Sequence, residues 1–225
     1  ECRKFIEVGC GQGEFLGVLA EFPVQAYGVE HREDLVELAC KKGLDVVRGF
    51  TEDPDTVLGD NGPYDVFLSF NFLEHQPEPG VMLDCIWNNL TEDGLGLVTV
   101  PSLEYILQYD GYYELIRDHI AYYSFETLGN LLTLHGFEVL EEEMVNRDTC
   151  AVIVRKVQRE EKKVRPVEQA DVSTMEASYG MIRDEILKLS DTLQREGKTL
   201  AVWGASHQGF TLAATTCLKE TAKYI

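Results

Sequence analysis

The sequence has 225 residues, of which 44% are hydrophobic, and it carries 39 acidic against 20 basic side chains. This length and apolar content suffice for one large domain, or one domain and part of another, and exclude a generally disordered chain. Residues 1–155 carry a net charge of −20 and residues 49–116 contain no lysine or arginine. This part of the chain therefore lacks a basic surface for phosphates, and we expect no nucleic-acid partner.

The first predicted element is a buried strand at residues 5–8, followed by a glycine turn and a helix at residues 14–21. Three glycines within five residues cost backbone entropy that a plain turn does not require, and they allow the backbone to approach a ligand. The spacing G-x-G-x-G also differs from the G-x-G-x-x-G of dinucleotide-binding proteins. The turn and the strand end before it contain the candidate ligand-binding residues Glu7, Gly9, Cys10, Gly11 and Gly13.

Strand and helix patterns then alternate along the chain. Residues 25–30 and 44–48 predict strands on either side of an amphipathic helix at residues 32–42, which Gly43 ends. A loop rich in turn-forming residues follows, with a short helix predicted near residues 54–58. The side chains of the first two helices that are expected to face the core are Phe15, Leu16, Leu19, Leu35, Leu38 and Ala39.

Residues 64–70 are apolar enough for a central strand that is covered on both faces. A further strand and an aromatic loop follow. Ser124 is then expected to cap a helix, with Thr127 nearby, and Gly136 to end that helix. Alternating β and α elements predict a mostly parallel sheet, in which ligands lie at the carboxyl ends of the strands. The remaining predicted elements are a helix at 78–90, a strand at 95–100, a helix at 124–135, and an antiparallel hairpin of strands at 137–142 and 149–154.

The glycine motif, with an acidic residue two positions before its first glycine, resembles the first motif of class I S-adenosylmethionine (SAM)-dependent methyltransferases. The closing hairpin is similar to the end of the seven-stranded Rossmann-like sheet of that class. The resemblance implies an α/β fold, SAM as the cofactor and S-adenosylhomocysteine (SAH) as the product. The glycine turn would then meet the methionine part of SAM, and Glu7 its ammonium group, unless Glu7 only braces the turn.

Further cofactor-binding candidates follow the second, third and fourth strands. Glu30 can accept both hydroxyl groups of a ribose, a feature shared with NAD enzymes. Gly49 and Phe50 stand where the resemblance implies adenine, with Phe50 offering an apolar face. Asn71 and Phe72 lie in the strand-end loop expected to touch the ligand.

Candidate catalytic residues come from two segments. Glu74 and His75 place an acid and an imidazole beside the expected methyl-transfer site, where histidine suits general-base work near neutral pH. A structural role for this pair is the alternative, because a Leu-Glu-His at this place recurs in methyltransferases of differing chemistry. The tyrosine-rich loop at residues 110–125 adds His119 and Tyr122, and long loops on α/β sheets often carry function.

The carboxyl-terminal part is predicted to be a separate region, so that the domains are residues 1–155, a linker at 156–170 and residues 171–225. Apolar residues spaced by three and four along residues 171–196 predict a long helix. This helix would form a dimeric coiled coil or pack against the same chain. A second strand, glycine turn and helix start at residues 199–209 predict a truncated second α/β domain.

Four blocks in order resemble the C-methyltransferases of deoxysugars, which act on nucleotide-linked sugars. The blocks are the glycine motif with Glu30, residues 71–75, residues 100–124 and the second glycine turn at 203–209. The resemblance implies that a carboxyl-terminal Rossmann-like domain helps to hold the nucleotide-sugar. Two sugar-side positions depart from the family: Asn146-Arg147-Asp148-Thr149 replaces a His-Gly-Gly-Ser-like run, and Ser206-His207-Gln208 replaces a stretch with a typical lysine. The family's usual amino-terminal zinc-binding region is not part of this sequence.

We therefore predict methyl transfer from SAM to a small-molecule acceptor, at a carbon of a nucleotide-linked ketosugar, with His75 or His119 as the base. Methylation of oxygen or nitrogen in another metabolite is the alternative within this class. A nicotinamide-dependent oxidoreductase, or a non-catalytic SAM-binding protein, is the alternative from another class. Glu30 fits an oxidoreductase, but the glycine spacing and the closing hairpin do not.

The six cysteines form no C-x-x-C pair and none has zinc spacing to a histidine, so we expect no metal site and reduced thiols in the cytoplasm. The sequence shows no signal peptide and no apolar run long enough to span a membrane. The expected partner is a small-molecule substrate, with no membrane partner. We expect a monomer, or a homodimer through the helix at residues 171–196.

Overall fold

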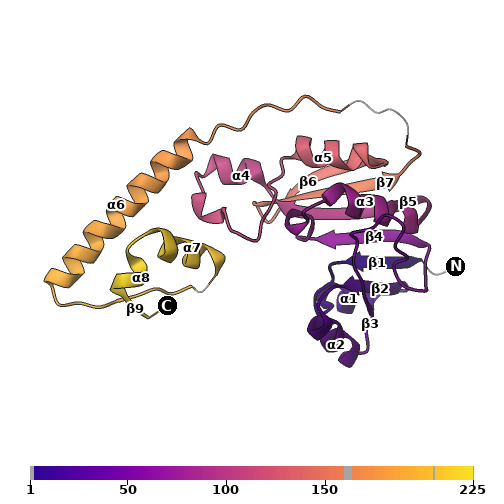
Figure 1. The fold of residues 1–225 in the computed structure, drawn as a ribbon, viewed down its shortest axis with the longest axis horizontal. Helices are drawn as coiled ribbons and strands as arrows, with labels where there is room; N and C mark the ends of the chain where they lie inside the picture. The colour runs from indigo at the N-terminus through magenta and orange to yellow at the C-terminus, as the bar shows by residue number, and fades with distance from the viewer. Residues whose placement is uncertain (1–2, 160–163, 205, 225) are drawn as a thin grey trace. The chain divides into compact units, whose positions relative to one another are not determined.

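The computed structural model describes residues 3–159, 164–204 and 206–224. Cys2, residues 160–163 of the predicted linker and Ala205 of the second glycine turn lie outside the described residues. The chain forms two compact units (Figure 1). The first unit consists of residues 1–102 and 120–167, and the second of residues 103–119 and 168–225.

The first unit is built on a seven-stranded sheet with the strand order β3-β2-β1-β4-β5-β7-β6. The first five strands are parallel, and β7 is inserted antiparallel between β5 and β6. This order confirms the predicted α/β class with a Rossmann-like sheet and a closing hairpin. The strands are β1 (Lys4–Val8), β2 (Gln25–Glu30), β3 (Asp45–Arg48), β4 (Tyr64–Phe70), β5 (Leu90–Pro101), β6 (Phe137–Val145) and β7 (Thr149–Lys156).

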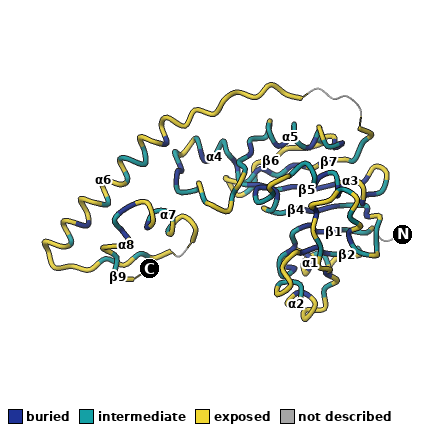
Figure 2. The backbone as a smooth tube through the Cα atoms, in the orientation of Figure 1, coloured by how far each residue is buried: buried dark blue, intermediate teal, exposed yellow. Residues whose placement is uncertain are grey.

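Helices connect these strands, and the core lies between them and the sheet. Figure 2 shows long buried stretches along the central strands, and β4 is one of them as predicted: Phe67 is fully buried and Leu68 nearly so. The helices of this unit are α1 (Glu14–Leu19), α2 (Glu33–Lys41), the single turn η1 (Leu73–His75), α3 (Pro79–Asn89) and α5 (Phe125–Leu134).

Two side chains that were expected to face the core are exposed. Phe15 is 49% exposed and Leu38 is 42% exposed. In α2 the inward positions are Val36 and Ala39, three residues apart, and Leu38 lies about 100° around the helix from Ala39. The apolar pattern predicted the helix correctly but placed its buried stripe one position away on the helix surface.

The prediction of a short helix near residues 54–58 is wrong. The segment is a turn in which the Asp53 carboxylate accepts the backbone N–H of Asp55 at 2.9 Å. Side chains of α3 bind the carbonyl groups of the segment, with Asn88 donating to Pro54 and Asn89 donating to Thr56. These bonds take the place of the backbone bonds that a helix would make, and Asp favours such local turns.

Ser124 caps α5 as predicted. Its hydroxyl accepts the backbone N–H of Thr127 at 3.2 Å, and the Thr127 hydroxyl accepts the backbone N–H of Ser124 at 2.8 Å. We expect Ser124→Ala to lower the free energy of unfolding by about 1 kcal/mol in urea denaturation, because a helix N–H loses its acceptor. Ser124→Asp keeps an acceptor and should remain close to the wild type; equal losses in both variants would contradict the capping role.

The second unit contains the segment that follows β5. This segment was predicted to be a loop of the first domain, but it forms α4 (Leu103–Gln108) and the turn η2 (Tyr112–Glu114). The compact units therefore divide the chain differently from the predicted boundary at residue 155. The remaining elements of this unit are α6 (Ser173–Arg195), β8 (Leu200–Ala201), α7 (His207–Thr215), α8 (Leu218–Thr221) and β9 (Ala222–Tyr224).

Packing in the second unit centres on Tyr112, which is buried. Its ring lies 5.0 Å from the ring of Tyr179 on α6, edge to face, and its hydroxyl lies 3.4 Å from the Thr215 hydroxyl at the end of α7. Part of the predicted apolar seam of α6 thus packs against its own chain, since Met175 is also buried. Across the described ranges, no helix combines the length and the apolar character needed to cross a membrane.

Candidate functional site

The glycine turn follows β1, which lies between β2 and β4 in the sheet, at the point where the strand order reverses. Gly9, Gly11 and Gly13 have φ angles of +76°, +56° and +81°, a region that side chains other than glycine's rarely adopt. The turn is anchored by the Val29 carbonyl on β2, which accepts the N–H of Gly9 at 2.9 Å and that of Cys10 at 3.2 Å. The predicted turn is thus formed at the carboxyl end of β1.

A Cβ atom at Gly9 would overlap the ring of Phe72, which packs directly over the turn. We expect Gly9→Ala to destabilise the protein in urea unfolding by more than the 1–2 kcal/mol that is roughly the cost of a left-handed alanine, because Phe72 must also move. Gly17→Ala on α1 is the matched control, since a Cβ atom there meets nothing within 4 Å. That variant should be neutral or slightly stabilising.

Glu7 is the last polar side chain of β1 and is only 2% exposed. Burial raises the pKa of its carboxyl group to about 8, and the charge of Glu14 adds to the shift. Among the described residues, its Oε2 atom has no hydrogen-bond partner. A buried carboxylate without a partner is costly to the fold, so Glu7 is suited to meet a positively charged ligand group.

Glu30 is buried at the end of β2 and braces the glycine turn. Its Oε2 atom accepts the N–H of Gly11 at 3.1 Å, and its Oε1 atom accepts the N–H of Arg32 at 2.9 Å. The Nδ1 atom of His31 lies 2.9 Å from the same Oε1. An ionised carboxylate accepts about four hydrogen bonds, so Glu30 retains capacity for a ligand hydroxyl while its orientation is fixed by the protein.

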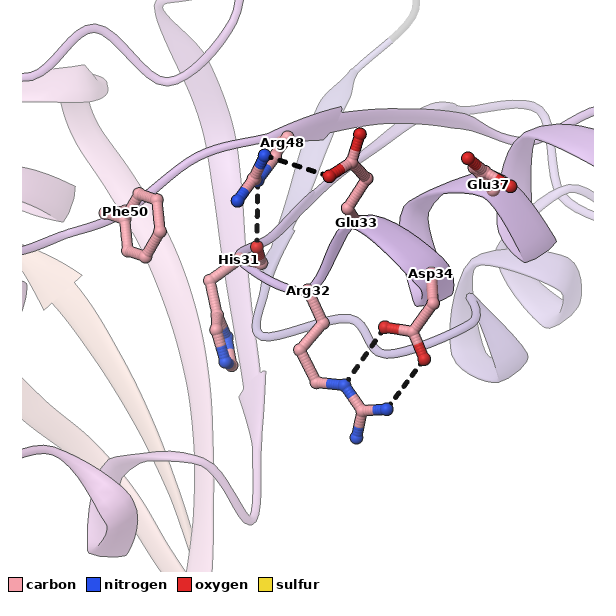
Figure 3. A pocket seen from close by; sticks show the side chains of 7 residues that line it. All are labelled: His31, Arg32, Glu33, Asp34, Glu37, Arg48 and Phe50. Atoms are coloured by element: carbon pink, nitrogen blue, oxygen red, sulfur yellow. Dashed lines mark hydrogen bonds and ion pairs between the residues drawn. The ribbon is translucent and has the colours of Figure 1, made fainter.

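A surface pocket of about 580 Å³ opens beside Glu30, between the start of α2 and the end of β3 (Figure 3). The ring of Phe50 lines it and is 48% exposed, and the N–H of Gly49 donates to the Glu30 carbonyl at 3.1 Å. The pocket's arginines are engaged by acids: Arg32 forms two bonds to Asp34, as Figure 3 shows. The exposed apolar face at Phe50 suits a planar ring.

The charges around the turn disfavour a dinucleotide. In dinucleotide-binding folds the diphosphate lies on the glycine turn, but here the carboxylate of Glu30 accepts the Gly11 N–H of that turn. Glu14 is a second acid beside it, since its Oε2 atom comes within 3.8 Å of where a Cβ of Gly11 would stand. A diphosphate at this place would meet like charge, which argues against the oxidoreductase alternative.

Asn71 and Phe72 follow β4, as predicted. Asn71 has a φ angle of +45°, and its N–H donates to the Thr99 carbonyl on β5 at 2.9 Å. The Thr99 hydroxyl donates to the Asn71 side chain at 3.1 Å, which fixes an exposed amide at the strand end. The ring of Phe72 lies against the glycine turn, so the structure brings the loop after β4 and the loop after β1 together.

Glu74 is the most unusual acid of the site. It is 1% exposed, burial raises the pKa of its carboxyl group to about 7, and the charge of His75 acts in the opposite direction. In the part of the chain that the structure describes, neither carboxylate oxygen has a hydrogen-bond partner. The Nε2 atom of His75, a half-exposed side chain, lies 3.9 Å from Oε1 of Glu74. The Glu74 carboxyl group can therefore bind or release a proton near neutral pH, beside the His75 imidazole.

The sequence reasoning missed Tyr123 as a site residue. Its hydroxyl is buried and has no hydrogen-bond partner among the described residues, and burial followed by the charge of Glu74 raises its pKa to about 12. The backbone carbonyl of Glu74 accepts the N–H of Ile120 at 2.9 Å and that of Ala121 at 3.2 Å. The sequence offers no alternation that separates the two tyrosines, and only the folded chain shows that Tyr123 is buried while Tyr122 is partly buried.

All cofactor candidates, with Glu74, His75 and Tyr122, belong to the first unit. All of these except Tyr122 lie at or just after the carboxyl ends of β1 to β4. His119 is the last residue of the segment 103–119 and so belongs to the second unit. The structure therefore divides the four predicted catalytic residues between the two units.

A seven-stranded sheet of this order with a glycine turn after β1 defines the class I methyltransferase fold. The family model described as a methyltransferase domain matches residues 2–142, more than half of the chain. The chain therefore belongs to this family of methyltransferase domains, as predicted.

A curated relative is NovU, a C-methyltransferase of Streptomyces niveus, which is 24% identical over 227 residues. The match covers 93% of this chain and 54% of NovU, so the chain spans about half the length of that relative.

Solved structures show the same fold at low identity. A SAM-dependent methyltransferase of Methanosarcina mazei has a TM-score of 0.57 and 14% identity, with 70% of this chain and 93% of that chain covered. The [4+2]-cyclase SpnF has a TM-score of 0.55 and 16% identity, with 69% and 76% covered. Since a protein named for cyclisation shares the fold, the fold alone does not define the reaction.

Proposed function

We propose that this methyltransferase acts on a carbon atom of a small molecule, and that the acceptor is a nucleotide-linked ketosugar. The name and 93% coverage of the relative NovU support a carbon acceptor. The observation within the chain that carries the proposal is the buried Glu74 carboxyl group beside the half-exposed His75 imidazole. Methylation of a carbon next to a carbonyl needs a base, and this pair supplies one.

The residues at the glycine turn fit SAM. The unpartnered buried carboxylate of Glu7 suits the ammonium of the methionine part, which would relieve its burial cost. Glu30, already oriented by the Gly11 N–H, suits the ribose hydroxyls. Phe50 and the backbone at Gly49 suit the adenine ring. The turn itself, from Gly9 through Cys10 to Gly13, would line the methionine part.

In the proposed reaction, His75 removes the proton from the carbon next to the ketone, and the electron pair of that C–H bond passes into an enolate. Bound SAM supplies the methyl group to which the enolate carbon forms its new bond, and the S–C bond breaks to give SAH. The ionised form of Glu74 stabilises the imidazolium that His75 becomes. His119 is the second candidate base, and Tyr122 a candidate donor to the enolate oxygen.

The acceptor's diphosphate would be held by the carboxyl-terminal part of the chain, residues 156–225. Residues 49–116 contain no lysine or arginine, whereas residues 156–225 contain 11 of the 20 in the chain. Phosphate binding relies on such cations and on backbone N–H groups. The cations of this part of the chain are therefore proposed to hold the diphosphate, while Glu74 and His75 act on the carbon next to the ketone.

Incubation of the full-length protein in D2O with SAH and a set of nucleotide-linked ketosugars tests the proposal. We expect deuterium to enter the carbon next to the ketone, detected by mass spectrometry and NMR, and this exchange to be lost in His75→Ala. A parallel reaction with ¹³C-methyl SAM identifies the atom that is methylated. A methyl group on oxygen or nitrogen, with no exchange at carbon, would overturn the proposal in favour of the alternative acceptor class.

A further inference from the structure

His31 directly follows Glu30 and is tied to it. The Nδ1 atom of His31 lies 2.9 Å from Oε1 of Glu30, while the other carboxylate oxygen is held by the Gly11 N–H at 3.1 Å. The two bonds engage both oxygens of the carboxylate. Glu30 is buried, whereas His31 is half-exposed.

The backbone of His31 is fixed as well. The Nε atom of Arg48 donates to the His31 carbonyl at 3.2 Å, and Nη1 of the same arginine pairs with Glu33 at 3.3 Å (Figure 3). The ring of His31 lies 6.0 Å from the ring of Phe50, tilted by 48°. His31 therefore links the predicted ribose acceptor to the predicted adenine face, although neither the sequence patterns nor the family resemblance had assigned it a role.

We propose that His31 is a positioning residue for the cofactor: its Nδ1–H holds Glu30 in the orientation that accepts the ribose hydroxyls. This inference rests on the proposed placement of the nucleoside at Glu30. A carboxylate whose side chain is already ordered does not lose that freedom when the ligand binds, so the ligand binds more tightly. Without His31, Oε1 of Glu30 keeps only the Arg32 N–H, and water enters beside the carboxylate.

Three variants separate the hydrogen bond from the ring. His31→Asn places an amide N–H near the position of Nδ1 and keeps the donor. His31→Phe keeps a ring beside Phe50 and loses the donor, and His31→Ala loses both. His135→Ala is the matched control, because His135 also pairs with a carboxylate, Asp84 at 2.8 Å, in the same unit but away from the pocket.

Isothermal titration of the full-length protein with SAH measures the effect. We expect the affinity to fall about tenfold or more in His31→Ala and His31→Phe, because a charge-assisted hydrogen bond is lost. It should stay within about threefold of the wild type in His31→Asn and in His135→Ala. A SAH analogue without the two ribose hydroxyls should bind His31→Ala and the wild type equally, since the residue acts through the ribose acceptor.

Retained affinity in His31→Phe with a loss in His31→Asn would show a ring contact and overturn the positioning role. An equal loss for SAH and for the analogue would do the same. The test is separable from that of the proposed function. If the wild type binds SAH and His31→Ala binds it equally well, only this inference fails; if the wild type binds no SAH, the nucleoside placement fails first.

Discussion

Replacing Glu7 with Gln is expected to stabilise the free protein at pH 8 and to weaken its binding of SAH. Burial raises the pKa of the Glu7 carboxyl group from 4.5 to about 8. Between these values the folded protein keeps a proton that the unfolded chain has lost. Stability is therefore full below about pH 4.5 and falls as the pH rises to about 8, by at most roughly 1.4 kcal/mol per unit. Gln carries no charge and should remove this loss.

Urea unfolding at pH 5, 6.5 and 8 measures the effect. The pH slope should be smaller in Glu7→Gln than in the wild type, with the gap largest at pH 8. Glu74 adds its own slope between pH 4.5 and about 7 in both proteins, so the difference between them isolates Glu7. Glu21→Gln, at an exposed position after α1, is the control and should follow the wild type. Identical slopes in all three would refute the buried-acid assignment.

The raised pKa of the Glu7 carboxyl group also predicts that SAH binding releases a proton. A cationic ammonium beside Glu7 lowers the pKa of its carboxyl group, so binding near pH 6.5 should release close to one proton in the wild type and none in Glu7→Gln. Titration calorimetry in two buffers of different ionisation enthalpy counts this proton. Affinity in the wild type should rise with pH towards 8, and it should be flat in the variant if Glu7 is the group involved.

Sequence patterns predicted those features that depend on neighbours along the chain. The glycines at positions 9, 11 and 13 predict a turn with a left-handed backbone, and Ser124 with Thr127 predicts a helix cap. Both predictions were possible because each feature is formed within a few residues. The apolar run of β4 indicates a central strand for the same reason. The alternation of strands and helices was then enough to predict the sheet.

Features that depend on distant contacts were not predictable in this way. Residues 103–119 were predicted to form a loop of the first domain. In the structure the Tyr112 ring packs against Tyr179 and its hydroxyl lies near that of Thr215, both from the other end of the chain. The burial of Glu7 and Glu74 is equally a property of the folded sheet. The sequence named both acids, but only their burial explains why one suits a cation and the other can keep a proton near neutral pH.

The largest catalytic effect is expected from Glu74. We expect Glu74→Gln to lower kcat by about 10²–10⁴-fold at pH 8, because His75 loses the charge that stabilises its protonated form. The KM for SAM should change little, since Glu74 is not among the cofactor candidates. Burial raises the pKa of Glu74 to about 7, so the acid is neutral in the wild type at low pH and ionised at high pH.

This pKa gives the prediction a pH signature. At pH 5.5 both the wild type and Glu74→Gln have an uncharged group beside His75, and their kcat values should be similar. The ratio of wild-type to variant kcat should grow as the pH rises through about 7 and then level off. Glu78→Gln, an exposed acid just before α3, is the matched control and should show a ratio near one throughout.

Measurement of the deuterium exchange rate, rather than methyl transfer, isolates proton removal from the later step. A ratio that stays constant with pH would mean that Glu74 serves the fold and not the base. Loss of exchange in His119→Ala with exchange retained in His75→Ala would move the base to the second unit. In that case Glu74 would keep a positioning role through its backbone. Its carbonyl accepts the N–H groups of Ile120 and Ala121, the residues that follow His119.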